Sequence, residues 1–336
     1  MNKLIFIRKE INKNETRTPL VPKDVKILTD DGFIIYVQSS ENRIYTDKEY
    51  EKNGAIITDK NWYSEEFNNF LIIGIKELDN LNKLNKHKHL YFSHCYKRQE
   101  NAKLILDSFS KSNSIIYDFE YFVNNKKRMI AFGYFAGLVG AILGLKQYSN
   151  KIKKIENINN LSSWKSLDDM INFINEDDYL ILKNSKIAII GPEGRCGKGV
   201  QFILDKLNLN YIKITKEDYN LLDVDIIYNC ILLDETYNKI WFNKETKFNK
   251  NLVITDISCD YNKNNNPIKI YNQETTWSKP VFNYNQFVDI IAISNLPSLL
   301  PLESSNDFSS KCLDLLLNFE NEHWKENLKI FMNVFN

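Results

Sequence analysis

The stretch Gly191-Pro-Glu-Gly-Arg-Cys-Gly-Lys-Gly199 lies between a short apolar run and an amphipathic segment. The run at 187–190 predicts a buried strand, and the segment from Val200 to Leu207 predicts a helix. Glycine allows a turn to adopt positive φ, and it lets backbone amides approach a ligand at a helix N-terminus. A strand, a glycine-rich loop and a helix in this order are typical of the phosphate-binding loop of a dinucleotide-binding domain.

Two details of this loop leave its ligand open. The glycines are spaced GxxGxxG, one residue longer at the start than the standard pattern, so a plain strand-to-helix turn is the alternative. A ribose-binding acid usually follows about 20 residues later, at the end of the second strand. Thr215 occupies that place, and Lys216, Glu217 and Asp218 follow it. Glu217 or Asp218 is a candidate for the acid, and the choice between NAD and NADP is open.

Strands and helices alternate on both sides of the loop. After it, strands are predicted at 211–215, 225–230, 252–257 and 289–293, which indicates a doubly wound parallel sheet. Before it, strands are predicted at 4–8, 33–38, 70–76, 90–94 and 114–120, and helices at 22–29 and 98–112. We therefore predict an α/β fold of two Rossmann-like domains. The substrate domain is predicted to comprise residues 1–132 with 302–336, and the dinucleotide-binding domain residues 133–301.

Three further segments complete the predicted domains. Residues 129–145 carry no charge, and their four glycines fall on one helical face. Since a membrane span needs about 20 apolar residues, we expect a buried helix packed closely on its neighbours. The polar stretch 149–184 is expected to be a helical connector on the surface. Residues 309–335 are expected to form a helix that folds back on the first domain.

Composition narrows the class of protein. The 336 residues include 44 Lys and Arg against 43 Asp and Glu, so no basic face for nucleic acid is indicated. Five scattered cysteines fit neither a zinc site nor a disulfide framework, and the apolar run at 4–7 is too short for a signal peptide. We expect a cytoplasmic protein that binds no membrane and no metal, and that is a monomer or a small homo-oligomer.

Two reactive side chains end predicted strands of the first domain. Lys76 follows the apolar strand at 71–75, and His94 follows the next one. Because ligands bind beyond the carboxyl ends of parallel strands, both are candidates for acid–base chemistry, with Glu120 closing a third strand. The general alternative is a surface or capping role. His87, His89 and His323 lie in polar stretches that are expected to be solvated, and we assign them no role.

Several motifs between about Arg8 and Pro301 resemble one enzyme family. They are ETR (15–17), GIKE (74–77), SHCYK (93–97), IYDFE (116–120), AFGYFAG (131–137), GRCG (194–197), YNC (228–230), DIS (256–258) and LPSLLP (296–301). In this order they are similar to the motifs of NAD-dependent, lysine-forming saccharopine dehydrogenases, relatives of alanine dehydrogenase. The resemblance implies an active site in the cleft between the domains. It also implies oxidation of saccharopine to an imine, which water converts to lysine and 2-oxoglutarate.

The same resemblance, with the loop pattern, implies roles for individual residues. Lys76 and His94 would be the acid–base pair, and Arg17 would hold a substrate carboxylate. The predicted substrate contacts are Arg17, Glu77, Lys97, Glu120, Phe132, Ser258, Cys259 and Asp260. The predicted dinucleotide contacts are Arg128, Gly191, Gly194, Arg195, Gly197, Thr215, Leu232, Ile257, Ile293, Ser294, Asn295 and Leu296. NAD is the expected cofactor, and an amino acid or 2-oxo acid is the expected substrate.

Two departures from the family and two alternatives accompany this interpretation. Ser294 stands where the family generally has Asp, and Thr215 replaces the ribose-binding acid. The alternatives are a related alanine- or opine-type dehydrogenase and a non-catalytic dinucleotide sensor. Cys196 and Cys230 follow strands that can be neighbours, so they are expected at one carboxyl edge. They are either two small buried residues or a pair that oxidation would link.

Overall fold

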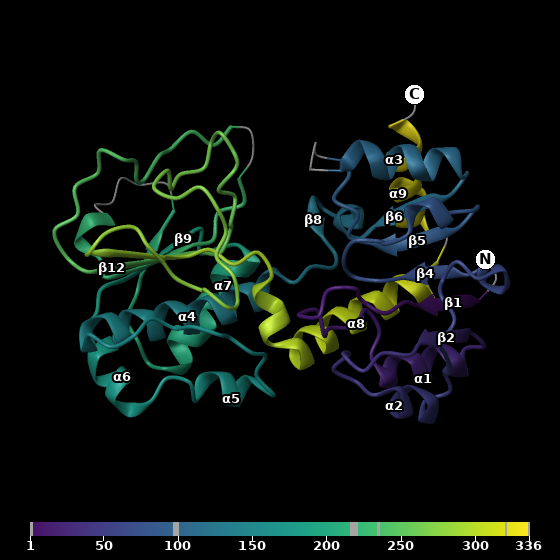
Figure 1. The fold of residues 1–336 in the computed structure, drawn as a ribbon, viewed down its shortest axis with the longest axis horizontal. Coiled ribbons are helices and arrows are strands. Elements are labelled where there is room, and N and C mark those ends of the chain that lie inside the picture. The colour runs from purple at the N-terminus through teal and green to yellow at the C-terminus, as the bar shows by residue number, and fades with distance from the viewer. Residues whose placement is uncertain (1–2, 97–100, 216–220, 234–235, 320, 335–336) are drawn as a thin grey trace. The chain divides into compact units, whose positions relative to one another are not determined.

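A computed structural model describes residues 3–96, 101–215, 221–233, 236–319 and 321–334 (Figure 1). It divides into two compact units. Unit 1 comprises Met1–Ala131 and Pro301–Asn336, and unit 2 comprises Phe132–Leu300. Each unit is an α/β fold built around a six-stranded sheet.

The sheet of unit 1 is wholly parallel, and its order is β3-β2-β1-β4-β5-β6. Its strands are β1 (Leu4–Ile7), β2 (Ile34–Gln38), β3 (Ile56–Thr58), β4 (Leu71–Ile73), β5 (Lys88–Tyr91) and β6 (Ile115–Asp118). The helices are α1 (Pro22–Asp30), α2 (Asp47–Lys52), α3 (Ala102–Lys111), α8 (Pro301–Leu317) and α9 (Glu322–Asn333). A small hairpin, β7 (Val123–Asn124) with β8 (Lys127–Arg128), follows the sheet. The strand order reverses between β1 and β4, and ligand sites of such sheets form at that point.

The tail of the chain lies in unit 1, and it forms two helices instead of the one expected. Helix α8 packs against α1, and α9 packs against β6. Asn321 is the N-cap residue at which α9 begins. Its side chain accepts hydrogen bonds from the amides of His323 and Trp324. The sequence-based prediction also missed β3, a three-residue edge strand without a buried residue.

Unit 2 contains a sheet of order β10-β9-β11-β12-β14-β13. The strands are β9 (Ile187–Ile190), β10 (Ile212–Ile214), β11 (Ile226–Asn229), β12 (Leu252–Asp256), β13 (Phe282–Asn283) and β14 (Val288–Ile291). The first four and β14 are parallel, as predicted, and the edge strand β13 is antiparallel. The helices are α4 (Gly133–Lys153), α5 (Leu167–Ile171), α6 (Glu176–Leu182) and α7 (Arg195–Lys206).

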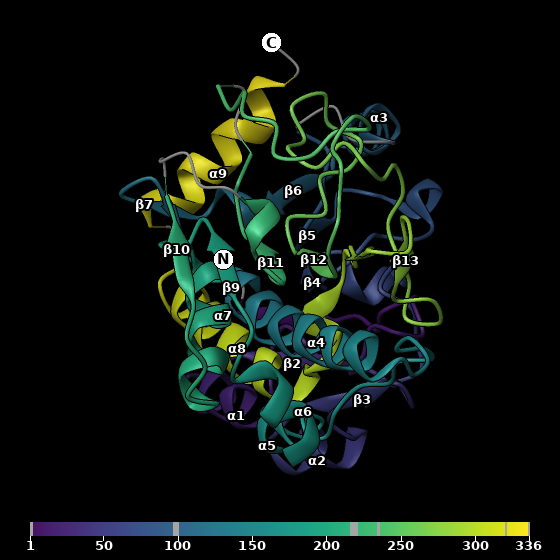
Figure 2. The same cartoon turned by 90° about the vertical axis from the view of Figure 1, so that its left-hand side faces the viewer.

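Alternate residues of the strands build two cores in unit 2. Ile187 and Ile189 face the core that contains the apolar side chains of α4 and α7, whereas Ala188 and Ile190 face the core formed with segment 241–287. Figure 2 shows α4 to α7 gathered on one side of the strands and the loops of that segment on the other. A strand buried on both faces reads as an unbroken apolar run, which explains why 187–190 was predicted correctly.

Helix α4 contacts α7 backbone to backbone. A Cβ added to Gly137 would lie 2.0 Å from the carbonyl oxygen of Cys196, and one added to Gly199 would lie 2.1 Å from that of Tyr134. Such approaches exclude any side chain at these two positions. The prediction of a buried, closely packed helix at 129–145 is therefore confirmed. Within the part of the chain that the structure describes, no helix is both long and apolar enough to cross a membrane.

The prediction of a helical connector on the surface at 149–184 is largely confirmed, because the stretch contains the end of α4 with α5 and α6, and most of its residues are exposed or half-buried. Residues 149–153 complete α4, and Met170 and Leu182 are buried in the core of unit 2. One carboxylate of the stretch is buried as well, because it is satisfied internally. Asp178 accepts hydrogen bonds from Lys146 (2.7 Å), Lys153 (2.7 Å) and Ser149 (2.6 Å), and its side chain is fully buried. It therefore joins α6 to α4.

His87 and His89 were expected to be solvated, and this was wrong. Both are buried, and their rings pack against Trp62 at centroid distances of 5.2 and 4.8 Å. The Nε2 atom of each lacks a hydrogen-bond partner within the described structure. Burial lowers the pKa of His87, and burial, followed by electrostatic interaction with His87 and Arg8, holds the pKa of His89 well below its usual range.

This burial predicts an acid-sensitive unit 1. Below about pH 6.5 the unfolded chain protonates His89 while the folded chain does not, so stability falls as pH falls, by up to about 1.4 kcal/mol per pH unit. Replacing His89 with Leu removes that contribution. We expect the loss of unfolding free energy between about pH 7.5 and 5.5 in urea melts to be smaller in His89→Leu than in the wild type. Equal losses would contradict the prediction.

Candidate functional site

Lys76 and His94 emerge at the same carboxyl edge of the sheet of unit 1. Pairing between β4 and β5 continues past their ends, because Gly74 N donates to Leu90 O (3.1 Å) and Phe92 N donates to Ile75 O (3.2 Å). Lys76 therefore comes directly after the last paired residue of one strand, and His94 follows two residues after that of its neighbour. The strands end earlier than predicted, but the two side chains leave the same edge.

A buried carboxylate fixes the turn that carries His94. Asp118, the last residue of β6, accepts hydrogen bonds from the amide (3.2 Å) and hydroxyl (2.5 Å) of Ser93. Its other oxygen accepts from the amide of Glu120 (2.8 Å). Burial raises the pKa of Asp118 above its usual value, and the Ser93 hydrogen bond opposes that shift. His94 itself has a φ of 50°, and its ring stacks on Phe92 at 6.2 Å.

Sequence reasoning missed Asp118 as a site residue. The signal was its position two residues before Glu120, near the end of the predicted strand 114–120. Glu120 lies in the 3-10 turn Phe119–Tyr121 and forms an ion pair with Arg128 at 3.1 Å. One predicted substrate contact is thus paired with one predicted cofactor contact within unit 1.

Arg17 is buried, with 3% of its side chain exposed, and it is paired with Glu15. Its Nε and Nη2 donate to the two oxygens of that carboxylate at 2.7 and 2.5 Å. A guanidinium held in this way is rigidly oriented, and its role toward a substrate stays a prediction. Glu77 is exposed. Lys97 lies outside the described residues.

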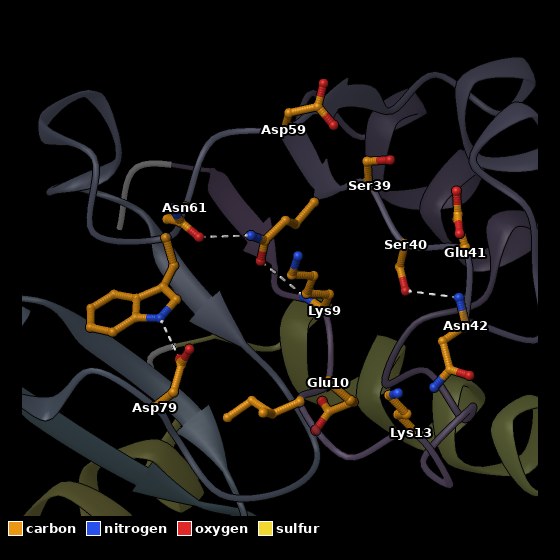
Figure 3. Close-up of a pocket in the computed structure, with 13 residues that line it drawn as sticks. Lys9, Glu10, Lys13, Ser39, Ser40, Glu41, Asn42, Asp59, Asn61 and Asp79 are labelled. Carbon is orange, nitrogen blue, oxygen red and sulfur yellow. Dashed lines mark hydrogen bonds between the residues drawn. The ribbon is translucent and has the colours of Figure 1, made fainter.

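A polar pocket of about 760 Å³ opens at the carboxyl ends of β1, β2 and β3 (Figure 3). Lys9 and Lys13 face it together with carboxylates that include Glu10 and Asp59. Part of its wall is fixed by internal hydrogen bonds, such as Trp62 Nε1 to Asp79 at 3.2 Å. None of the sequence-predicted site residues lines this pocket, so we place the candidate chemistry at the strand ends that carry Lys76 and His94.

In unit 2 the glycine loop forms a cradle at the start of α7. Gly191 has a φ of 77°, which favours glycine, and a Cβ on Gly197 would lie 2.4 Å from the carbonyl oxygen of Gly191. Gly194 is the N-cap of α7, and both Gly194 and Arg195 are exposed. The loop leaves backbone at a helix N-terminus open to solvent, which suits a pyrophosphate. These residues therefore fit a dinucleotide.

The other predicted dinucleotide contacts follow the ends of neighbouring strands. Thr215 is exposed just past β10, and Leu232, past β11, has 80% of its side chain exposed. Its contact with a dinucleotide stays a prediction. Past β14, Ile293 and Leu296 are buried, Ser294 is exposed, and Asn295 accepts a hydrogen bond from Trp277 Nε1 (3.0 Å). Residues 216–218, which hold the alternative acids, lie outside the described residues.

The predicted substrate contacts of unit 2 lie at two places. Phe132 is the N-cap of α4. Ser258 donates to the carbonyl of Ile231 (2.5 Å), and Cys259, whose φ is 51°, begins the turn to Asp260. Ile257, a predicted dinucleotide contact that directly follows β12, is 9% exposed. These turns follow from the buried Asp256, which accepts hydrogen bonds from Asn229, Tyr271 and the Cys259 amide; burial raises its pKa to about 6.

Cys196 and Cys230 lie together, as expected from their strands. Strands β9 and β11 are paired neighbours, and Cys230 directly follows β11. Burial, and then a hydrogen bond with the Cys196 thiol, raise the pKa of Cys230 well above its usual value. Both thiols are free, and their oxidation stays a prediction. Among the residues that the structure describes, no cluster of His, Cys, Asp or Glu could hold a metal ion.

The fold and this edge define the class of protein. A solved L-alanine dehydrogenase superposes with a TM-score of 0.72 and 13% identity, covering 98% of this chain and 94% of its own. The sequence profile of the alanine dehydrogenase/PNT N-terminal domain matches residues 6–139. The chain thus has the two-unit fold of the alanine dehydrogenases.

Sequence similarity narrows this class. The saccharopine dehydrogenase [NAD(+), L-lysine-forming] of Schizosaccharomyces pombe is 33% identical over 93% of this chain and 92% of its own length. The protein of the same name from Candida glabrata is also 33% identical, over 98% of this chain and 96% of its own. The chain belongs to the family of NAD-dependent, lysine-forming saccharopine dehydrogenases, and it is an oxidoreductase of the nicotinamide dinucleotide type.

Proposed function

We propose that this protein oxidises saccharopine, a secondary amine with three carboxylates, to lysine and 2-oxoglutarate with NAD. The observation that carries the proposal is the emergence of Lys76 and His94 from neighbouring strand ends in a member of this family. The reaction needs a proton removed from the amine, a proton removed from attacking water, and a proton returned to the leaving amine. Two adjacent acid–base groups suit those transfers.

The remaining residues would bind and orient. Arg17, fixed by Glu15, would present its guanidinium edge to a substrate carboxylate, and the Glu120–Arg128 pair would contribute charges of both signs. The loop 191–199 would hold the pyrophosphate, and Leu232 would contact a ring of the dinucleotide. When bound, NAD supplies the acceptor for the hydride.

The deciding experiment follows NADH oxidation in the presence of lysine and 2-oxoglutarate. We expect turnover with that pair and none above background with ammonia and pyruvate, the substrates of an alanine-type enzyme. Turnover only with ammonia and pyruvate would favour the alanine-type alternative. NADH binding without turnover of either pair would favour a dinucleotide sensor.

Cofactor choice gives a separate prediction. Thr215 stands where an acid would bind the ribose hydroxyls and repel a 2′-phosphate, so we expect only moderate affinity for NADH. We nevertheless expect kcat/KM to be higher with NADH than with NADPH, as the family name implies. Thr215→Asp should widen that preference, because a carboxylate disfavours the 2′-phosphate. A higher kcat/KM with NADPH in the wild type would overturn the assignment of NAD.

A further inference from the structure

The backbone of Lys76 is held by a buried ion pair. The pair lies just after β1, the strand that neighbours β4. The Glu10 carboxylate accepts hydrogen bonds from the amides of Ile75 (2.7 Å) and Lys76 (3.0 Å). The Arg8 guanidinium donates to the carbonyl of Lys76, so both peptide groups of that residue are engaged. Arg8 and Glu10 are themselves paired at 3.5 Å, with 2% and 5% of their side chains exposed.

Gly74 makes room for this arrangement. A Cβ at that position would lie 2.3 Å from the Cζ atom of Arg8, so the guanidinium rests directly on the glycine backbone. The amide of Arg8 also donates to the carbonyl of Ile73 (3.0 Å). The segment that follows β1 therefore holds the turn after β4 through main-chain and side-chain contacts. This turn lies where the strand order reverses, the place at which sheets of this order bind ligands.

We propose that Arg8 and Glu10 are positioning residues for Lys76, which fix the peptide from which its side chain extends. This inference rests on the proposed function for its consequence in catalysis. A buried ion pair is seldom favourable for stability compared with apolar residues of similar volume, so stability alone explains it poorly. Lysine has a long, flexible side chain. Fixing the backbone from which it extends reduces the number of positions that the amine samples. A catalytic group displaced by about 1 Å can lose on the order of 100-fold in rate.

Two variants disrupt the contacts of Arg8 and Glu10 with the backbone of Lys76 by different means. Glu10→Gln removes the charge and turns an acceptor into a donor opposite a backbone amide. Gly74→Ala keeps every charge and pushes the Arg8 guanidinium away from the Lys76 carbonyl. We expect each to lower kcat by roughly 10–100-fold, with the Kd for NADH unchanged within about twofold. The double variant should lose little more than either single one, since both break one interaction.

Asp47→Asn is the matched control. Asp47 is the ion-pair partner of Arg43 at 3.2 Å, in the same unit, and its other hydrogen bonds come from Ser39 and Ser40. We expect its kcat to stay within about twofold of the wild type, because its loss affects stability alone. Wild-type kcat in folded Glu10→Gln and Gly74→Ala would overturn the proposal, and so would multiplicative losses in the double variant.

A second measurement needs no turnover. The rate at which a small amine-reactive ester acylates Lys76 can be followed by peptide mass spectrometry, with the exposed Lys48 as the internal reference. We expect the Lys76 rate to rise in Glu10→Gln and Gly74→Ala, while Asp47→Asn leaves it unchanged. An unchanged rate in both variants contradicts the proposal that Arg8 and Glu10 hold the backbone of Lys76. A wild type that turns over no substrate contradicts only the proposed function, because the labelling still decides whether the backbone is held.

Discussion

Replacing Lys76 with Met, or His94 with Gln, is expected to lower kcat for saccharopine oxidation by roughly 10²–10⁴. Each change removes one of the two proposed proton carriers at the edge beyond β4 and β5. The dinucleotide loop lies in unit 2, so the Kd for NADH should stay close to that of the wild type. Stopped-flow and steady-state kinetics with fluorescence titration of NADH measure both quantities.

His323→Gln provides the control for the histidine change, since His323 lies at the start of α9 and belongs to neither set of predicted site residues. Its kcat should match that of the wild type. Near-full turnover in both Lys76→Met and His94→Gln would refute the acid–base assignment. A large loss of NADH affinity in either variant would instead indicate a disturbance of the whole fold.

Removing the carboxylate of Asp178 is expected to destabilise unit 2 strongly. Asp178→Ala leaves Lys146 and Lys153 facing each other without their shared counter-ion, and it breaks the capping box of α6 with Asn175. We expect a loss of about 3 kcal/mol in unfolding free energy, the low end for buried pairs because both lysines keep some contact with water. Urea denaturation of Asp178→Ala and of the exposed neighbour Asp177→Asn gives the comparison.

The same carboxylate predicts a pH dependence. Despite burial, hydrogen bonds from Lys146 and Lys153 lower the pKa of Asp178 to about 2. Its contribution is therefore complete above about pH 4, the value for an unfolded Asp, and is lost as pH falls toward 2. The gap in stability between wild type and Asp178→Ala should narrow over that interval. A constant gap, or a loss in Asp177→Asn as large as in Asp178→Ala, would contradict this account.

The sequence predicted those features that depend on local pattern. The buried strand 187–190 and its glycine loop were placed correctly. Burial on both faces requires apolar residues along the strand, and the positive φ at Gly191 favours glycine. The shared edge of Lys76 and His94 followed from the parallel order of the strands that precede them. The motifs from 15 to 301 then identified the family.

The residues that hold the site in place were missed because their partners are distant in the chain. Glu10 binds backbone amides 65 residues away, and backbone amides have no sequence signature. Asp118 binds Ser93 across 25 residues for the same reason. His87 and His89 were misjudged because polarity suggests solvent, whereas an aromatic wall formed by Trp62 and Phe109 encloses them. Only the folded chain shows such pairs.

The contact of Gly137 with Cys196 and of Gly199 with Tyr134 has a mechanical consequence. Where two helices meet through side chains, small rotamer changes let one slide over the other. At Gly137 and Gly199 backbone meets backbone, and no deformable side chain separates α4 from α7 at these two positions. The two helices should therefore move as one stiff body. Any adjustment of the loop 191–199 to its ligand has to rotate both together, with the bending confined to the peptide links between β9 and Gly194.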